Sequence, residues 1–267
     1  MDMLTYHFFN GEAVIKNYTI FGESNSKNEG SVSWGMRDEN GEEELPQLND
    51  ITTVLNCVII LFEKYFGKEY VESFQVSILP SIGYPVAYRK QNIIFLSAKG
   101  LRWSQYVYQF SHELCHMMIT GNVPKHLRWF EETICELSSF FFLSLISEQW
   151  ETNPPEHWRD YAPAFFKYKI NVMKKAKELL QSETLSAYIT KMLPALSEDP
   201  CKRDINALVA NNLLPIFVKN PGLWKDVPNL GKIPEDITFS ESLKTWKNLS
   251  ANKIAVENII DILIEQN

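Results

Sequence analysis

Apolar residues between positions 48 and 66 recur every three or four residues, which is the spacing of an amphipathic helix. The apolar positions are Ile51, Val54, Leu55, Val58, Ile59 and Phe62. Asn49 or Asp50 is suited to cap the start of this helix, and Gly67 follows its end. The pattern therefore predicts a helix that buries one apolar face.

Shorter apolar segments on either side of this helix have the composition of strands. The segments SFQVSILP (73–80) and QNIIFLSA (91–98) combine β-branched residues with flanking Pro, Gly or Asn, and each predicts a strand. Residues 4–22 mix β-branched and aromatic residues around a turn and predict a strand or hairpin. Residues 23–45 are polar and predict a loop with one short strand near 31–36.

The rest of the chain is almost wholly helical in pattern. The predicted helices cover residues 101–120, 124–147, 155–181, 184–197, 202–219 and 250–265. Since strands are confined to the first third, the sequence predicts an α+β fold of two lobes. Residues 1–120 would form an N-terminal α/β lobe with a small mixed sheet, and residues 121–267 a mainly helical C-terminal lobe.

Composition limits the classes of function. The 26 basic and 33 acidic side chains give a formal net charge of −7, which disfavours binding to duplex nucleic acid because that needs a basic face. The apolar runs are far shorter than the roughly 20 residues that span a bilayer, so no membrane span is expected. The first ten residues lack the features of a secretory signal peptide. The four cysteines are widely scattered, which argues against a disulfide framework and predicts a reducing, cytoplasmic location. They contain no CxxC pair, so a zinc site made of cysteines is not expected.

The segment QFSHELCHMMIT, residues 109–120, contains the most specific chemical pattern in the chain. His112 and His116 are four residues apart, so both imidazoles leave the same face of a helix and can reach one zinc ion. Glu113 is rotated by about 100° from His112 and is suited to act as general base on a metal-bound water. This is the HExxH arrangement of zinc hydrolases, and the alternative is a helix that carries two histidines by chance.

A zinc hydrolase site needs a third protein ligand, and the next predicted helix contains three acidic candidates. The segment KHLRWFEETICELSSFFFL offers Glu131, Glu132 and Glu136, while Phe130, Ile134, Leu137 and Phe141 are expected in the core. Glu132 and Glu136 share a face by their four-residue spacing. Glu136 would either orient a histidine through its second ring nitrogen or be exposed to solvent.

These two helices together resemble the gluzincin zinc metallopeptidases, many of which carry W-x-x-E-G-x-A-E after HExxH. Trp129 and Glu132 match the tryptophan and the ligand glutamate of this pattern, and Glu136 matches the trailing acid. Thr133 and Cys135 depart from it, since Gly and Ala are usual there. The resemblance covers residues 88–150 and implies a thermolysin-like catalytic core with zinc on His112, His116 and Glu132.

The resemblance also implies two further features of the site. The strand at 91–98 would be the edge of the sheet along the cleft, where an extended peptide can pair with it. A downstream side chain would donate a hydrogen bond to the oxyanion that forms on the attacked carbonyl. His157, Tyr161 and Tyr168 are candidates for this role, and Tyr161 is the predicted one.

The sequence therefore predicts a zinc-dependent metallopeptidase that acts on a peptide or an unfolded protein segment. Its catalytic residues would be Glu113 and Tyr161, its cofactor Zn²⁺, and its oligomeric state is left open. One alternative is a catalytically silent scaffold that binds a protein or peptide in the same cleft. Another is a helical interaction protein without a metal.

Overall fold

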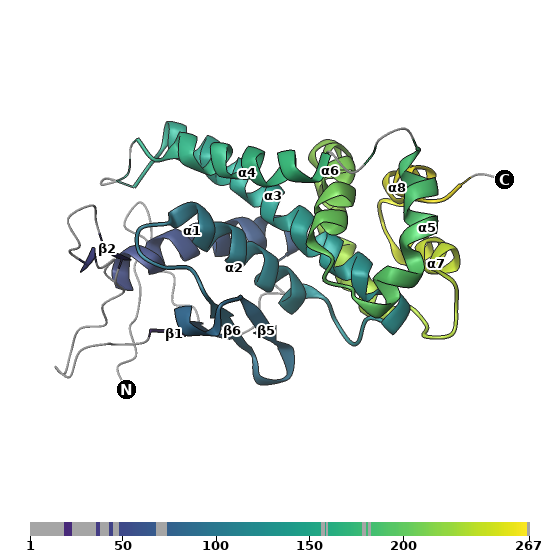
Figure 1. The fold of residues 1–267 in the computed structure, drawn as a ribbon, viewed down its shortest axis with the longest axis horizontal. Coiled ribbons are helices and arrows are strands. Elements are labelled where there is room, and N and C mark those ends of the chain that lie inside the picture. Colours follow the sequence, from purple (N-terminus) through teal and green to yellow (C-terminus); the bar gives the residue numbers. More distant parts are fainter. Residues whose placement is uncertain are drawn as a thin grey trace. The chain divides into compact units, whose positions relative to one another are not determined.

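The structure is a computed structural model that describes residues 19–22, 36–37, 43–44, 48–67, 74–155, 158, 160–177, 180 and 183–265. The described part is mainly helical and contains a small mixed sheet, so its class is α+β (Figure 1). No helix in these ranges is both long and apolar enough to cross a membrane. Most of the predicted hairpin at 4–22, nearly all of the predicted strand at 31–36, and His157 lie outside the described residues.

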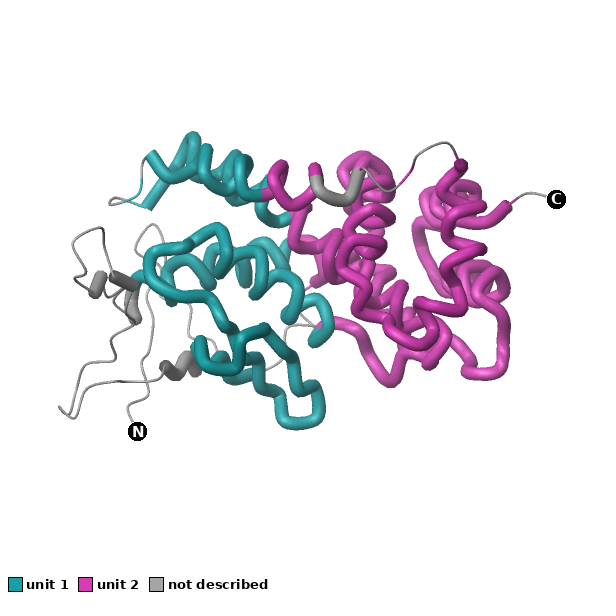
Figure 2. Tube along the Cα trace, viewed as in Figure 1, with its two compact units in different colours: residues 1–64, 68–117, 142–168 teal, residues 65–67, 118–141, 169–267 magenta. Residues whose placement is uncertain are grey.

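The chain forms two compact units, each of them discontinuous in sequence (Figure 2). Unit 1 takes residues 1–64, 68–117 and 142–168, and unit 2 takes residues 65–67, 118–141 and 169–267. The predicted boundary after residue 120 lies close to the change of unit at 117/118. The units differ from the predicted lobes because the chain returns to unit 1 over residues 142–168.

Unit 1 contains a four-stranded sheet with the order β1-β4-β6-β5. The strands are β1 (Thr19–Gly22), β4 (Gln75–Ile78), β5 (Val86–Tyr88) and β6 (Ile93–Leu96). β1 and β6 both pair with β4 in parallel, and β5 pairs with β6 in antiparallel orientation. Two further strands of two residues each, β2 (Met36–Arg37) and β3 (Glu43–Glu44), pair with each other in antiparallel orientation and form a separate sheet.

This topology corrects the prediction that the strand at 91–98 lies at the edge of the sheet. β6 is paired on both sides, and β5 is the edge. The sequence did not reveal β5 because it has only three residues between two short 3-10 turns, Pro80–Ile82 and Arg89–Gln91. Gly83 and Asn92 end these turns in the left-handed backbone region, which brings β5 back alongside β6.

The helices of unit 1 follow the predicted apolar spacing. α1 (Leu48–Phe66) buries every apolar position listed for it, and most of it belongs to unit 1. α2 (Trp103–Met118) follows the sheet, and the second half of α3 (Arg128–Thr152) and the start of α4 (Ala162–Lys177) complete the unit. Phe62 of α1 stacks on Phe142 of α3 with ring centroids 4.2 Å apart, so aromatic packing joins these helices.

Unit 2 is built from helices and 3-10 turns in the described part of the chain. Its elements are the first half of α3, the end of α4, α5 (Leu185–Glu198), α6 (Arg203–Lys219), α7 (Phe239–Leu249) and α8 (Lys253–Leu263), with 3-10 turns at Lys125–Leu127, Pro221–Lys225 and Val227–Lys232. α7 was not predicted. A capping box starts it, since Thr238 accepts from the Glu241 backbone N–H and the Glu241 carboxylate accepts from the Thr238 N–H.

Hydrogen bonds of the buried residue Asp226 connect the last two helices of unit 2. Its carboxylate accepts from the backbone N–H groups of Ala251 and Asn252 at 2.9 and 3.1 Å, just before α8 begins. Its backbone carbonyl accepts from Trp246 Nε1 of α7 at 2.9 Å. Asp226 thus satisfies donors at a helix start that has no side-chain cap of its own.

Candidate metal centre

The helix that carries HExxH places its two histidines on one face. The apolar spacing of this helix predicts a buried face of Val107, Phe110, Leu114, Met117 and Met118, and all of these are buried except Met117, which is half-buried. His112 and His116 are half-buried, with ring centroids 5.1 Å apart and an angle of 62° between the ring planes. Because one continuous helix carries both side chains, this pairing follows directly from their four-residue spacing.

Gln109 fixes α2 to the strand that precedes it. Its Oε1 accepts from the backbone N–H groups of Ser97 and Ala98 at 3.0 and 2.9 Å, and its Nε2 donates to Ser97 Oγ at 3.0 Å. All three residues are buried. Gln109 lies three residues before His112, so this clamp sets the position of the histidine-bearing turn relative to the end of β6.

Replacing Gln109 with Leu is expected to lower the free energy of unfolding by about 2–4 kcal/mol, because two buried backbone donors lose their acceptor. Urea unfolding followed by circular dichroism measures the change. Gln105→Leu on the same helix is the matched control, since Gln105 is only half-buried. Equal stability of the two variants would show that the clamp contributes little.

Glu113 is buried and only 5% exposed. It follows His112 directly on α2, so its side chain leaves the helix about 100° away from that histidine. Glu113, like His112 and His116, has at least one interaction partner in the structure. Its predicted role as general base is compatible with this position next to the histidine face, and the role stays a prediction.

The hydroxyl of Tyr161, the predicted oxyanion donor, lies at the start of α2. It accepts from the Ser104 backbone N–H at 3.3 Å and is 3.4 Å from Ser104 Oγ. Ser104 precedes His112 by eight residues, which is about 12 Å along a helix. Tyr161 also packs against Trp150 and Phe165 in an aromatic cluster. No contact that the structure gives for Tyr161 involves a histidine, and its catalytic role stays untested.

Tyr168, the other tyrosine candidate, contacts the histidine side of α2. Its ring lies 5.6 Å from that of Tyr108, measured between centroids. Tyr108 is one helical turn before His112 and therefore on the same face as the two histidines. Both tyrosines are half-buried. Of the two described tyrosine candidates, Tyr168 is thus the one that contacts a residue on the histidine face of α2, namely Tyr108.

The acidic candidates of α3 differ in burial. Glu132 is half-buried, whereas Glu131 and Glu136 are 5% and 7% exposed. The alternative that Glu136 is exposed to solvent is therefore wrong. All three glutamates have interaction partners. The core positions predicted for this helix, Phe130, Ile134, Leu137 and Phe141, are all buried.

Thr133, which stands where the gluzincin pattern has glycine, is fully buried. Its hydroxyl donates to the Trp129 carbonyl at 3.0 Å and lies 3.4 Å from Asn206 Oδ1 of α6. Asn206 in turn donates to the Pro200 carbonyl at 2.8 Å. The larger side chain is accommodated in unit 2 because its polar atom has partners on both its own helix and α6.

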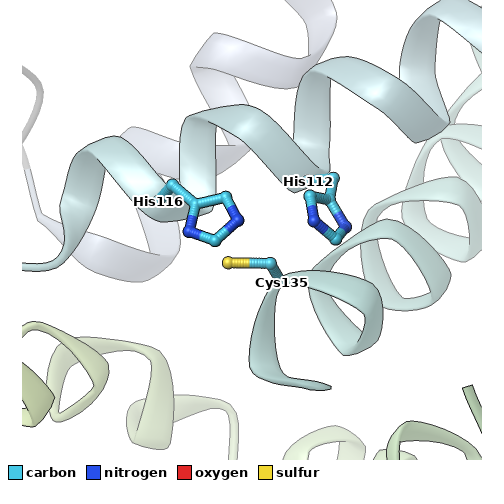
Figure 3. Close-up of side chains that lie close together, drawn as sticks. All are labelled: His112, His116 and Cys135. Atoms are coloured by element: carbon cyan, nitrogen blue, oxygen red, sulfur yellow. The ribbon is translucent and has the colours of Figure 1, made fainter. Parts of the chain in front are cut away.

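His112, His116 and Cys135 form a group that could hold a metal ion (Figure 3). One potential ligand atom from each residue lies within 4.8 Å of the others, and Cys135 is fully buried. Glu132 is described by the structure but is not a member of this group. Cys135 was not predicted as a candidate ligand from the sequence. Its position three residues after Glu132, on the same helix face, is the signal that could have indicated it.

Comparisons of this chain with protein-family models, curated proteins and solved structures found no match. The gluzincin resemblance therefore remains a hypothesis that rests on the motif residues themselves.

Proposed function

We propose that the protein is a zinc-dependent peptidase of the gluzincin type. The observation that carries this proposal is the pair His112 and His116, which α2 presents on one face with ring centroids 5.1 Å apart. Glu113 stands directly after the first of them. Two imidazoles and an adjacent carboxylate at this spacing match a catalytic zinc site better than a structural histidine pair.

The donor set fits zinc. Neutral imidazole nitrogens, carboxylate oxygens and thiolate sulfurs are all common zinc ligands, and three protein ligands are typical of a catalytic site. His112 and His116 would supply two of them, and α3 the third, with Glu132 the ligand predicted from sequence and Cys135 the one grouped with the histidines. Zinc held there would supply a water of lowered pKa.

Glu113 would then move the proton. In the proposed reaction its carboxylate takes a proton from the attacking water and passes it to the nitrogen of the cleaved peptide bond. Its burial favours this role, because a carboxylate screened from bulk water exchanges its proton mainly with groups inside the site. The substrate would be a peptide or an unfolded protein segment, and a cytoplasmic location stays the prediction from the scattered cysteines.

The different contacts of Tyr161 and Tyr168 allow a direct test of which tyrosine is the oxyanion donor. Removing an oxyanion donor lowers kcat by about 10²–10³-fold. If Tyr168 is that donor, Tyr168→Phe loses this factor in kcat, while Tyr161→Phe mainly loses stability because its bond to Ser104 is removed. Steady-state kinetics of both variants decide between them. A large fall in kcat for Tyr161→Phe alone would restore the residue predicted from sequence.

Hydrolysis of a library of quenched fluorescent peptides tests the proposed function. We expect cleavage by the protein as purified, loss of cleavage with a zinc chelator, and recovery when one equivalent of zinc is returned. Cleavage that a chelator leaves unchanged would contradict the proposal. Tight zinc binding without cleavage of any peptide would instead favour the scaffold that binds a partner in the cleft.

A further inference from the structure

The helix α4 has a charge opposite to that of the protein as a whole. Its residues, 162–177, include five lysines and no acidic residue, whereas the whole chain has a formal net charge of −7. Every other α-helix of the described chain contains at least one Asp or Glu. A concentration of one charge on a single helix indicates a partner of the opposite charge.

An apolar stripe runs along the exposed side of α4. Pro163, Phe166 and Ile170 are three and four residues apart, so they lie within about 60° of one another around the helix axis. All three are exposed, and Phe166 and Ile170 keep 51% and 41% of their surface accessible. One continuous helix carries the whole stripe, so its spacing is set by helical geometry alone.

Two exposed lysines border this stripe. Lys167 lies four residues after Pro163, and Lys174 lies four residues after Ile170, so each is a surface neighbour of an apolar residue. Their methylene chains can cover apolar surface while their ammonium groups reach outward. Apolar side chains flanked by lysines are typical of a helix that lies in the interface of a membrane.

The opposite side of α4 faces the protein interior. Phe165, Lys169 and Met173 are buried there. The Phe165 ring contacts Trp150 of α3 with ring centroids 4.9 Å apart. A partner can therefore approach α4 from one side only, which favours a flat surface over a protein that wraps around a helix.

We infer that α4 binds the surface of a membrane that contains anionic lipids, with the helix axis parallel to the membrane plane. Phe166 and Ile170 insert at the boundary between headgroups and acyl chains, and Lys167 and Lys174 contact the anionic headgroups. The association is peripheral, since no helix of the described ranges is long and apolar enough to cross a bilayer. It does not depend on the proposed peptidase activity.

Co-sedimentation of the full-length protein with vesicles tests this inference. The vesicles contain phosphatidylcholine alone or phosphatidylcholine mixed with phosphatidylserine. We expect the protein to sediment with the mixed vesicles and not with the neutral ones, and binding to weaken as salt screens the lysines. The net charge of −7 opposes binding to an anionic surface, so such a result requires a local basic site.

Two double variants locate the binding surface. Lys167→Gln with Lys174→Gln should weaken binding about 25-fold, which is about fivefold for each lysine. Phe166→Ser with Ile170→Ser should weaken it by about tenfold or more, because the inserted apolar surface is lost. All four positions are exposed, so circular dichroism should show an unchanged fold.

The matched control lies on α8, where an exposed lysine also stands beside an exposed apolar residue. Lys253→Gln with Ile254→Ser makes the same kinds of change, and Ile254 is 83% exposed. This variant should bind the mixed vesicles as the parent does. Equal loss of binding in the control and in the α4 variants would overturn the assignment to α4.

Three other results would overturn the inference. They are a parent protein that binds neither kind of vesicle, one that binds both equally, and α4 variants that bind like the parent. A parent that ignores vesicles but is retained on immobilised polyglutamate through Lys167 and Lys174 would assign α4 to an acidic protein instead. The comparison of the two vesicle types needs no variant, and none of these results bears on zinc content or peptide hydrolysis.

Discussion

Replacing Glu113 with Gln is expected to abolish peptide hydrolysis while the bound zinc is retained. Gln has nearly the same shape as Glu but does not accept the proton of the attacking water, so kcat should fall by about 10²–10⁴-fold. The metal should stay because Glu113 is not one of the proposed ligands. Parallel measurements of kcat and of zinc per chain check the two halves of this expectation.

The control for this variant is Glu151→Gln, which makes the same chemical change at an exposed position of α3. It should leave kcat and zinc content at the parent values. Thermal unfolding of both variants shows whether the buried change also affects stability, because Glu113 is only 5% exposed. A Glu113→Gln protein as active as the parent would contradict the proposed role of this residue.

Replacing Gly231 with Ala is expected to lower the stability of the protein more than the same replacement at Gly83, Gly121 or Gly222. A Cβ atom at Gly231 would lie 1.7 Å from the Thr120 carbonyl oxygen and 2.7 Å from its carbonyl carbon. Backbone atoms cannot move aside as a flexible side chain can. We expect the free energy of unfolding to fall by more than about 4 kcal/mol. Only a few mechanisms cause losses of this size, and steric overlap of buried atoms is one of them.

The close approach at Gly231 joins two loops of unit 2. Thr120 donates to the Pro228 carbonyl from both its N–H and its hydroxyl, at 3.3 and 2.9 Å. Gly121 has a φ of 77°, and a Cβ there would lie 2.8 Å from the Gly231 carbonyl oxygen. The chain that leaves α2 after the histidines is therefore held by the turn at Val227–Lys232.

Gly83→Ala is the control for Gly231→Ala. Gly83 has a φ of 81°, but no atom lies within 4 Å of its added Cβ, so only backbone strain of about 1–2 kcal/mol is expected. Urea unfolding of both variants separates strain from steric overlap. If Gly231→Ala loses no more stability than Gly83→Ala, the two loops do not approach as closely as the structure indicates.

Periodicity predicted the long helices because each buries a regular apolar stripe. α1, α2 and α6 begin and end within two residues of the predicted ranges. β5 and α7 were missed for different reasons. β5 is too short to show a pattern, and its place in the sheet depends on pairing with β6. α7 follows a proline-containing turn, although the Thr238–Glu241 capping box marks its start in the sequence.

The candidate site was partly predictable for the same reason. The relation of His112 to His116 is local, so helical spacing alone predicts that they share a face. Helical spacing does not determine which side chain of α3 would complete the ligand set, because that choice depends on tertiary structure. The contacts of Tyr161 with Ser104 and Trp150 likewise arise from tertiary packing.

The zinc content of the purified protein tests the central claim most directly. The protein is prepared without added metal, and zinc per chain is measured by plasma mass spectrometry for the parent, His112→Ala and His126→Ala. His126 is the control because it is not a proposed ligand, and its Nε2 lies 2.8 Å from Ser242 Oγ in unit 2. A single zinc site predicts about one zinc per chain in the parent and His126→Ala and little in His112→Ala. A parent without zinc, or a His112→Ala protein with the parent's content, would contradict the account.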